Sequence, residues 1–328
     1  MFESKASKRL LSIYLMIILS VLTVLSGCRN NIVIEETPDT PQAQVLHITA
    51  TAFAPYDFCR QIAGDMADVE ILIGPGEDSH SYTPSNKDLE KIKSADIFIY
   101  TGTENRINKA IETGDNPNRK IINVSSLVPN LEVKIPEEME ESFETNDTAI
   151  RHTKYDEHVW TSIDNAEVIC QEIADTLCEI DEKNSSYYRS NCEVYLSQLS
   201  SLKRDIKRIV STAERKTIIM AGRYSMRYFA EEFGLKVYTA YPDCTKPYGD
   251  YPEAVKYLEE KMRNDYIPVV FYDEMTQGSI AQKITDGTGK KTAVFYSCHN
   301  ISMEDYIGGA TYLELMTRNK QTLETALN

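Results

Sequence analysis

Apolar and polar positions along the first half of the chain follow a strand period and a helix period in turn. Strands are predicted at 45–52, 69–73, 96–100 and 120–123, and helices at 56–63, 85–94, 105–113 and 163–180. Strands separated by helices favour right-handed crossovers and a mostly parallel sheet. Between 125 and 157 the pattern stops, and this Glu-rich stretch is predicted to be a long loop without regular structure.

The second half repeats the alternation. Strands are predicted at 217–221, 236–241, 268–272 and 292–296, and helices at 225–233, 251–264, 279–286 and 303–327. The chain therefore predicts an α/β fold with two lobes, each built on a mostly parallel sheet flanked by helices.

A single long helix is predicted between the lobes. Residues 185–213 contain no Gly or Pro and carry one apolar stripe at alternating three- and four-residue steps: Tyr188, Cys192, Tyr195, Leu199, Leu202, Ile206 and Ile209. Such a helix would extend roughly 40 Å, enough to join two lobes rigidly. The predicted organisation is thus a lobe at 45–184, a linking helix at 185–213 and a lobe at 214–328; a coiled-coil dimer is the competing interpretation of the stripe.

The amino terminus has the pattern of an export signal. Lys5, Lys8 and Arg9 precede a long apolar run, so residues 1–27 are predicted to be a signal peptide rather than a spanning helix. The sequence at 25–28 resembles a bacterial lipobox, which implies a diacylated Cys28 at the start of the mature chain. Residues 28–44 are polar and predict a flexible tether, so the body is expected on the extracytoplasmic face of a bacterial membrane.

Composition narrows the classes of function. The 328 residues are 42% hydrophobic and 26% charged, as in a folded protein, and carry a formal net charge of −15. Removal of the signal peptide makes this charge more negative, so no nucleic-acid partner is expected. Beyond Cys28 there are six cysteines without a CxxC pair, which argues against a structural zinc cluster, while export permits disulfides.

Candidate chemistry gathers where predicted strands end, because loops at the carboxyl ends of parallel strands line the ligand crevice. His80 lies in the Gly/Pro-punctuated loop that begins at 74, His158 in the segment DEHVW, and His299 just after the last strand. Arg223, Asp273, Glu274 and Cys298 also occupy strand ends. Imidazoles with a carboxylate suit a borderline cation such as Zn²⁺.

Four segments together resemble the solute-binding lipoproteins of zinc and manganese ABC importers, of the ZnuA and TroA type. They are GEDSHSYTPSNKDLEKIKSADIFIYTG, DEHVW, the long helix and RYFAEEFGL. The resemblance covers the chain from about residue 45 onward. It implies two lobes joined by a rigid helix, a metal ion held between them, and delivery of that metal to a membrane permease.

The resemblance also implies ligands. His80 and His158 match the family's two histidines of the first lobe, and Glu274, with Asp273 beside it, matches an acidic position. Arg223 occupies the position of the third histidine, and an arginine cannot donate a lone pair to a metal. We therefore expect His299 to replace it, with Glu274 or water in the fourth position.

Alternatives for the ligand from the second lobe stay open. Cys298 could bind as a thiolate, or it could pair with Cys244 in a disulfide, which the zinc branch of the family implies and which would leave His299 free to bind. Arg223 could neutralise Glu274 or form an ordinary ion pair. An imidazole-rich site favours Zn²⁺ over Mn²⁺ as the bound cargo.

The leading hypothesis is a non-catalytic receptor that captures zinc and passes it to an ABC permease. An exported zinc hydrolase is the rival enzyme, but the sequence contains no HExxH, GxSxG or GxxxxGK[ST] motif. A surface adhesin with a vestigial metal site is the third possibility, because Arg223 departs from the ligand pattern.

Overall fold

A computed structural model describes residues 45–102, 104, 107, 108, 111, 117–143, 155–242, 251–276 and 278–328. From residue 45 onward the chain forms one compact unit. The predicted signal peptide, Cys28 and tether lie outside the described residues. Within the described part, no helix is long and apolar enough to cross a membrane.

The first sheet lies in the amino-terminal lobe. Its four parallel strands are β1 (Leu46–Ala50), β2 (Ala67–Ile71), β3 (Ile97–Tyr100) and β4 (Lys120–Asn123), in the order β2-β1-β3-β4. Helices α2 (Phe53–Ala63) and α3 (Asn86–Ser94) connect successive strands. The order reverses between β1 and β3, which is where an open α/β sheet forms a ligand crevice.

The second sheet repeats this topology. Its parallel strands are β5 (Thr217–Arg223), β6 (Lys236–Tyr241), β7 (Val269–Asp273) and β8 (Lys291–Phe295), in the order β6-β5-β7-β8. Its helices are α7 (Arg227–Phe233), α8 (Pro252–Asn264) and α9 (Ser279–Thr285). The predicted α/β fold with two parallel sheets is confirmed.

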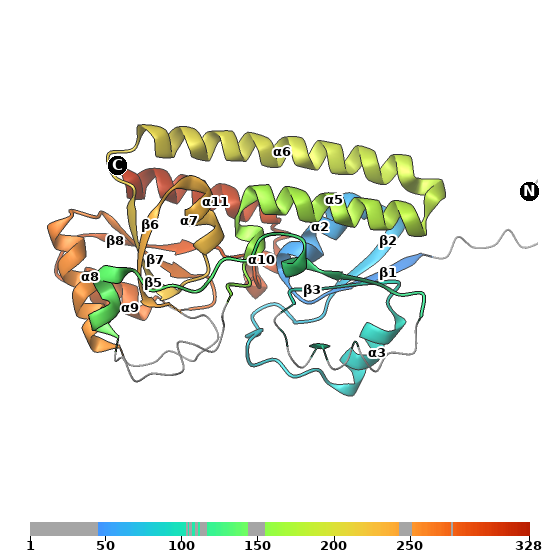
Figure 1. Cartoon of the computed structure of the whole chain (residues 1–328), viewed down its shortest axis with the longest axis horizontal. Coiled ribbons are helices and arrows are strands. Elements are labelled where there is room, and N and C mark those ends of the chain that lie inside the picture. Colours follow the sequence, from blue (N-terminus) through green and yellow to red (C-terminus); the bar gives the residue numbers. More distant parts are fainter. Residues whose placement is uncertain are drawn as a thin grey trace, which may run out of the picture. The chain divides into compact units, whose positions relative to one another are not determined.

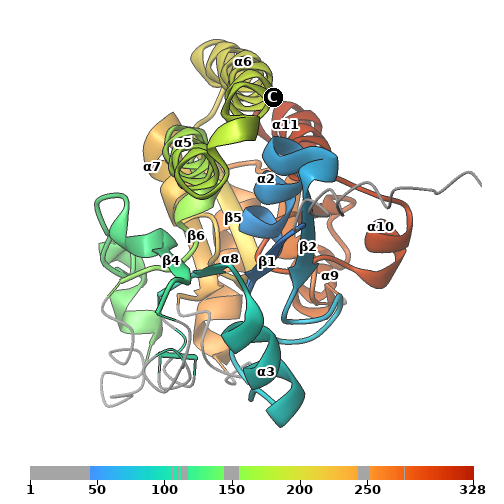
Figure 2. The ribbon, with the colours of Figure 1, turned by 90° about the vertical axis from the view of Figure 1, so that its right-hand side faces the viewer.

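Helix α6 (Ser185–Thr212) runs along both lobes (Figure 1). In the first lobe it packs on α5 (Ile163–Ile180) and α2. In the second lobe it packs on α7 and α11 (Tyr312–Leu327). Figure 2 shows α2, α5, α6 and α11 gathered on the same side of the sheets. The whole predicted apolar stripe of α6 is buried, so the helix links the lobes by packing within the chain.

The main hydrophobic core continues from one lobe to the other. The same cluster contains Phe58 and Ile173 from the first lobe and Phe229, Phe295 and Tyr312 from the second. The divisions at 184 and 213 therefore do not separate independent cores, and the predicted domain boundaries stay a prediction.

Two sequence predictions were wrong in detail. The terminal helix predicted at 303–327 is two helices, α10 (Met303–Ile307) and α11, because Gly309 adopts a left-handed φ of 72° that ends the first. The stretch 125–157 includes a 3-10 helix at Glu137–Ser142, whose Met139 is buried with Phe143 among apolar residues of the second lobe. Residues 144–154 lie outside the described part.

Candidate metal site

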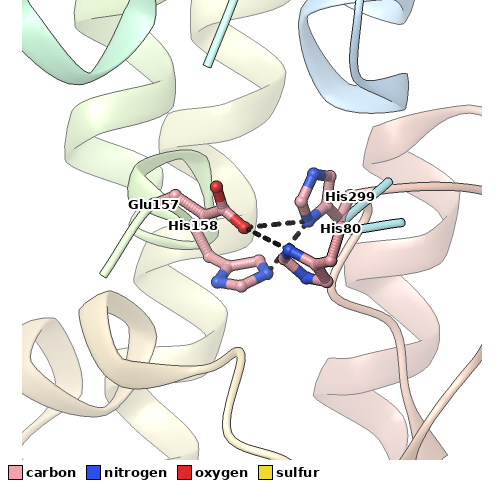
Figure 3. A group of neighbouring side chains, drawn as sticks. All are labelled: His80, Glu157, His158 and His299. Atoms are coloured by element: carbon pink, nitrogen blue, oxygen red, sulfur yellow. Dashed lines mark hydrogen bonds and ion pairs between the residues drawn. The ribbon is translucent and has the colours of Figure 1, made fainter. Parts of the chain in front are cut away.

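Three imidazoles and one carboxylate meet between the lobes. His80, Glu157, His158 and His299 each offer a ligand atom, and these atoms all lie within 4.8 Å of one another. Figure 3 shows the four side chains pointing toward a common centre. Glu157, His158 and His299 are buried, and the His80 side chain is only 11% exposed.

His80 comes from a turn at the carboxyl side of β2. Gly76 in this turn has a φ of 82°, a left-handed conformation that glycine adopts without strain. The Asp78 carboxylate accepts a hydrogen bond from the backbone N–H of His80 at 3.1 Å. This short local bond fixes the turn that carries the imidazole.

His158 lies at the start of a short 3-10 helix, Val159–Thr161, that leads into α5. Oδ1 of Asp156 accepts from the backbone N–H of His158 at 2.8 Å and lies 3.0 Å from its Nδ1. A bond from Nδ1 to a carboxylate fixes the orientation of the ring and leaves Nε2 for a metal. That Nε2 lies 3.1 Å from Nδ1 of His299.

His299 follows β8, but first-lobe groups hold the backbone around it. The Trp160 indole donates to the carbonyl of Ser297 at 2.8 Å, and the backbone N–H of Phe53 donates to the carbonyl of His299 at 2.9 Å. The N–H of Phe53 lies at the first turn of α2, where helical partners are missing. His299 is therefore positioned by both lobes.

Three of the donor pairs have spacings close to those of a tetrahedral cation site. Ligands about 2.0–2.2 Å from zinc in a tetrahedron stand roughly 3.3–3.6 Å apart. Nδ1 of His80 lies 3.2 Å from Oε1 of Glu157, which lies 3.8 Å from Nδ1 of His299. The cavity lined by the three histidines measures about 30 Å³, which is room for one water-sized occupant.

Burial keeps two of the imidazoles neutral. Burial, His158 and Arg223 lower the pKa of His80 to about 3, and burial with His158 and His80 lowers the pKa of His299 well below its usual value. Both rings thus present lone pairs at neutral pH. Burial opposes the charged form of His158, but the carboxylates of Asp156, Glu157 and Glu274 together raise the pKa of His158, so a bound metal would displace a proton there.

Glu274 lies outside this group of four donors. Its carboxylate accepts from the backbone N–H and hydroxyl of Ser297 at 2.9 and 2.7 Å, and from the backbone N–H of Cys298 at 3.0 Å. Burial raises the pKa of Glu274 to about 7. These contacts hold the segment that carries His299, so the geometry favours Glu157 over Glu274 as the carboxylate ligand.

Arg223 meets Asp78 across the site. Its guanidinium donates two hydrogen bonds to the Asp78 carboxylate. The pairing with Glu274 was one of the alternatives left open from the sequence. Cys298 is buried, and Cys244 lies outside the described residues. A disulfide between them and a Cys298 thiolate ligand both stay predictions.

The sequence reasoning missed Glu157 and Asp156, which immediately precede His158. Glu157 is only 5% exposed, so it is not a solvated surface side chain. The sequence feature that could have pointed to them is the acidic pair itself, which stands at the end of a loop and just before a helix. Of the remaining histidines, the His47 side chain is 58% exposed on β1, and His152 lies outside the described residues.

Replacing Asp156 with asparagine is expected to raise the Kd for zinc about 10- to 100-fold, the usual cost of losing a carboxylate that orients a metal-bound imidazole. Competition with a zinc chelator measures this change. Arg227→Lys is the control, because Arg227 is the other charged neighbour of Asp156, with Nε 3.5 Å from Oδ2. An unchanged Kd in Asp156→Asn would show that the carboxylate does not orient His158.

Comparison with known proteins finds a matching family model and similar proteins. A family model described as zinc-uptake complex component A, periplasmic, matches residues 48–326. The zinc-binding lipoprotein AdcA of Streptococcus pneumoniae strain R6 is 28% identical over 289 residues, which cover 85% of this chain and 55% of AdcA. The chain therefore spans about half the length of that relative.

Two further matches cover nearly the whole of the compared protein. The high-affinity zinc uptake system protein ZnuA of Bacillus subtilis is 26% identical over 287 residues, covering 86% of this chain and 88% of the relative. The crystal structure of the Zn(II)-bound ZnuA-like domain of S. pneumoniae AdcA has a TM-score of 0.70 at 26% identity. It covers 86% of this chain and 98% of that domain.

Proposed function

The chain belongs to the family of periplasmic zinc-uptake complex component A proteins, and from this premise we propose that it captures Zn²⁺ between its lobes for an ABC importer. The observation that carries the proposal is the group of four buried donors from both lobes. A receptor of this kind binds its cargo and releases it unchanged, so the proposed role involves no catalysis.

The proposed ligands are His80, His158, His299 and Glu157. Three imidazoles and one carboxylate whose ligand atoms lie within 4.8 Å of one another suit Zn²⁺, whereas Mn²⁺ prefers oxygen-rich, higher coordination. The relatives AdcA and ZnuA are named for zinc, which supports zinc as the cargo of this chain. Glu157 takes the fourth position that the sequence reasoning gave to Glu274 or water.

The proposed place of action is the extracytoplasmic face of the membrane, with Cys28 as the lipidated residue and an ABC permease as the partner. The family description as periplasmic and the name of AdcA as a lipoprotein support this placement. The apolar run before Cys28 supports it independently.

The site disfavours the other two functions. A zinc hydrolase keeps an open coordination position for water, but here four protein donors lie within 4.8 Å of one another, enough to fill a tetrahedral shell. An adhesin with a vestigial site would have no reason to keep these four donors together, and in the described structure they lie within 4.8 Å of one another.

Zinc titration of the body at 45–328, followed by metal analysis, tests the proposal. We expect one zinc per chain and a change in tryptophan fluorescence. The chain has a single tryptophan, and its ring centroid lies 5.8 Å from that of His158 and 5.3 Å from that of His299. A strain lacking the gene should grow poorly under zinc chelation and recover with added zinc; absence of binding, or normal growth under chelation, would count against the receptor.

A further inference from the structure

The proposed site has an inter-lobe ion pair on its wall. Arg223 ends β5 in the second lobe, and its guanidinium donates from Nη1 to Oδ1 of Asp78 at 3.1 Å and from Nη2 to Oδ2 at 3.0 Å. This two-fold contact is the strong geometry of arginine with a carboxylate. The Arg223 side chain is 17% exposed and that of Asp78 is 38% exposed, and both residues line the cavity that His80, His158 and His299 also line.

Asp78 transmits this contact to a proposed ligand. Its Oδ1 accepts from Arg223 and also from the backbone N–H of His80, two residues further on. Arg223 therefore reaches across the cleft to the turn that presents the His80 imidazole.

The end of β5 is itself fixed, so Arg223 is held in place. Oδ2 of Asp273 accepts from the backbone N–H of Arg223 at 3.2 Å. The same oxygen lies only 2.3 Å from where a Cβ at Gly222 would stand, so the close approach requires glycine there. The guanidinium thus projects from a rigid strand end toward the turn of the other lobe.

The pair also balances charge beside the proposed cargo. A guanidinium is permanently charged and cannot ligate a metal, so alone it would repel a bound cation. In contact with Asp78 its charge is neutralised locally. The same pair can therefore hold the His80 turn against the second lobe and make a cationic wall compatible with zinc.

We propose that the Arg223–Asp78 pair is an inter-lobe clasp that holds the His80 turn closed over the cargo and thereby slows zinc release. Arg223 acts as a positioning residue through Asp78 and does not bind the metal. The role in slowing zinc release rests on the proposed function. The contact itself is present in the protein without metal.

Two measurements on the same variants test the clasp. The first is the zinc dissociation rate, from stopped-flow transfer to a chelator in excess, together with the association rate. Asp78→Asn should speed dissociation about tenfold or more, since it breaks the ion pair and leaves Arg223 unneutralised, with a smaller effect on association. Arg223→Lys, which keeps the charge but loses the two-fold contact, should fall between Asp78→Asn and the native chain.

The second measurement is hydrogen exchange of the amides at 76–81 in the metal-free protein. Asp78→Asn and Arg223→Gln should each speed exchange there, and the double variant should add little to either, as expected for residues that act through one contact. Lys320→Met is the matched control: its ion pair with Asp205 has the same 3.0 Å distance and similar exposure, 23% and 43%, but joins α11 to α6. It should change neither readout.

The outcomes separate the two proposals. The clasp would be overturned if Asp78→Asn released zinc at a rate within twofold of the native rate, or if the exchange effects of the two single variants multiplied in the double variant. The receptor proposal would still stand if the native chain bound one zinc. A native chain that binds no zinc would overturn the receptor and the retention role, and the exchange measurement would still report whether the pair holds the turn.

Discussion

Replacing His299 with alanine is expected to raise the Kd for zinc by more than about 100-fold, beyond the usual effect of losing a group that only orients a ligand. Its Nδ1 lies 3.1 Å from Nε2 of His158 and 3.8 Å from Oε1 of Glu157, so its loss leaves one corner of the tetrahedron without a donor. Chelator competition on the variant measures the affinity. His80→Ala should have an effect of similar size.

His47→Ala is the matched control for these histidine variants, because His47 is exposed on β1 and should leave the affinity unchanged. The pattern across the variants identifies the ligand of the second lobe. A large loss in His80→Ala with none in His299→Ala would contradict the assignment of His299 and make Cys298 and Glu274 the next candidates.

The fold could be read from the sequence to the extent that local pattern determines it. Helix α5 begins and ends at the predicted residues, and so does strand β4, because their apolar periods are clear and their boundaries are sharp. The break between α10 and α11 was missed although the sequence marks it, with Gly308 and Gly309 ending the first helix and the capping box of Thr311 and Glu314 starting the second.

The candidate site was predictable where topology alone brings residues together. His80 and His299 lie in segments that follow β2 and β8, and two sheets with parallel strands turn such ends toward one crevice; His158 lies at the start of the 3-10 helix Val159–Thr161. Glu157 was not predictable in this way, because its burial depends on packing of its loop against the His80 turn and the segment around His299. The partner of Arg223 lies 145 residues away, and no local pattern relates the two.

Geometry also distinguishes Glu157 from Glu274, the glutamate that the sequence favoured as a ligand. Oε1 of Glu157 faces two imidazoles at 3.2 and 3.8 Å, whereas the Glu274 carboxylate accepts three hydrogen bonds from Ser297 and Cys298. A buried carboxylate whose lone pairs are used by the backbone supports a ligand rather than being one. The two residues should therefore respond differently to the same substitution.

Glu157→Gln is expected to weaken zinc binding by more than about 100-fold, because it removes the negative ligand from a buried site and leaves a neutral amide oxygen. Glu274→Gln should weaken binding about tenfold at most, but it should lower the melting temperature of the metal-free protein, since an amide cannot accept all three hydrogen bonds that the carboxylate accepts. Zinc affinity by chelator competition and thermal unfolding without metal distinguish the two effects. A larger loss of affinity in Glu274→Gln than in Glu157→Gln would reverse the assignment and return the fourth position to Glu274.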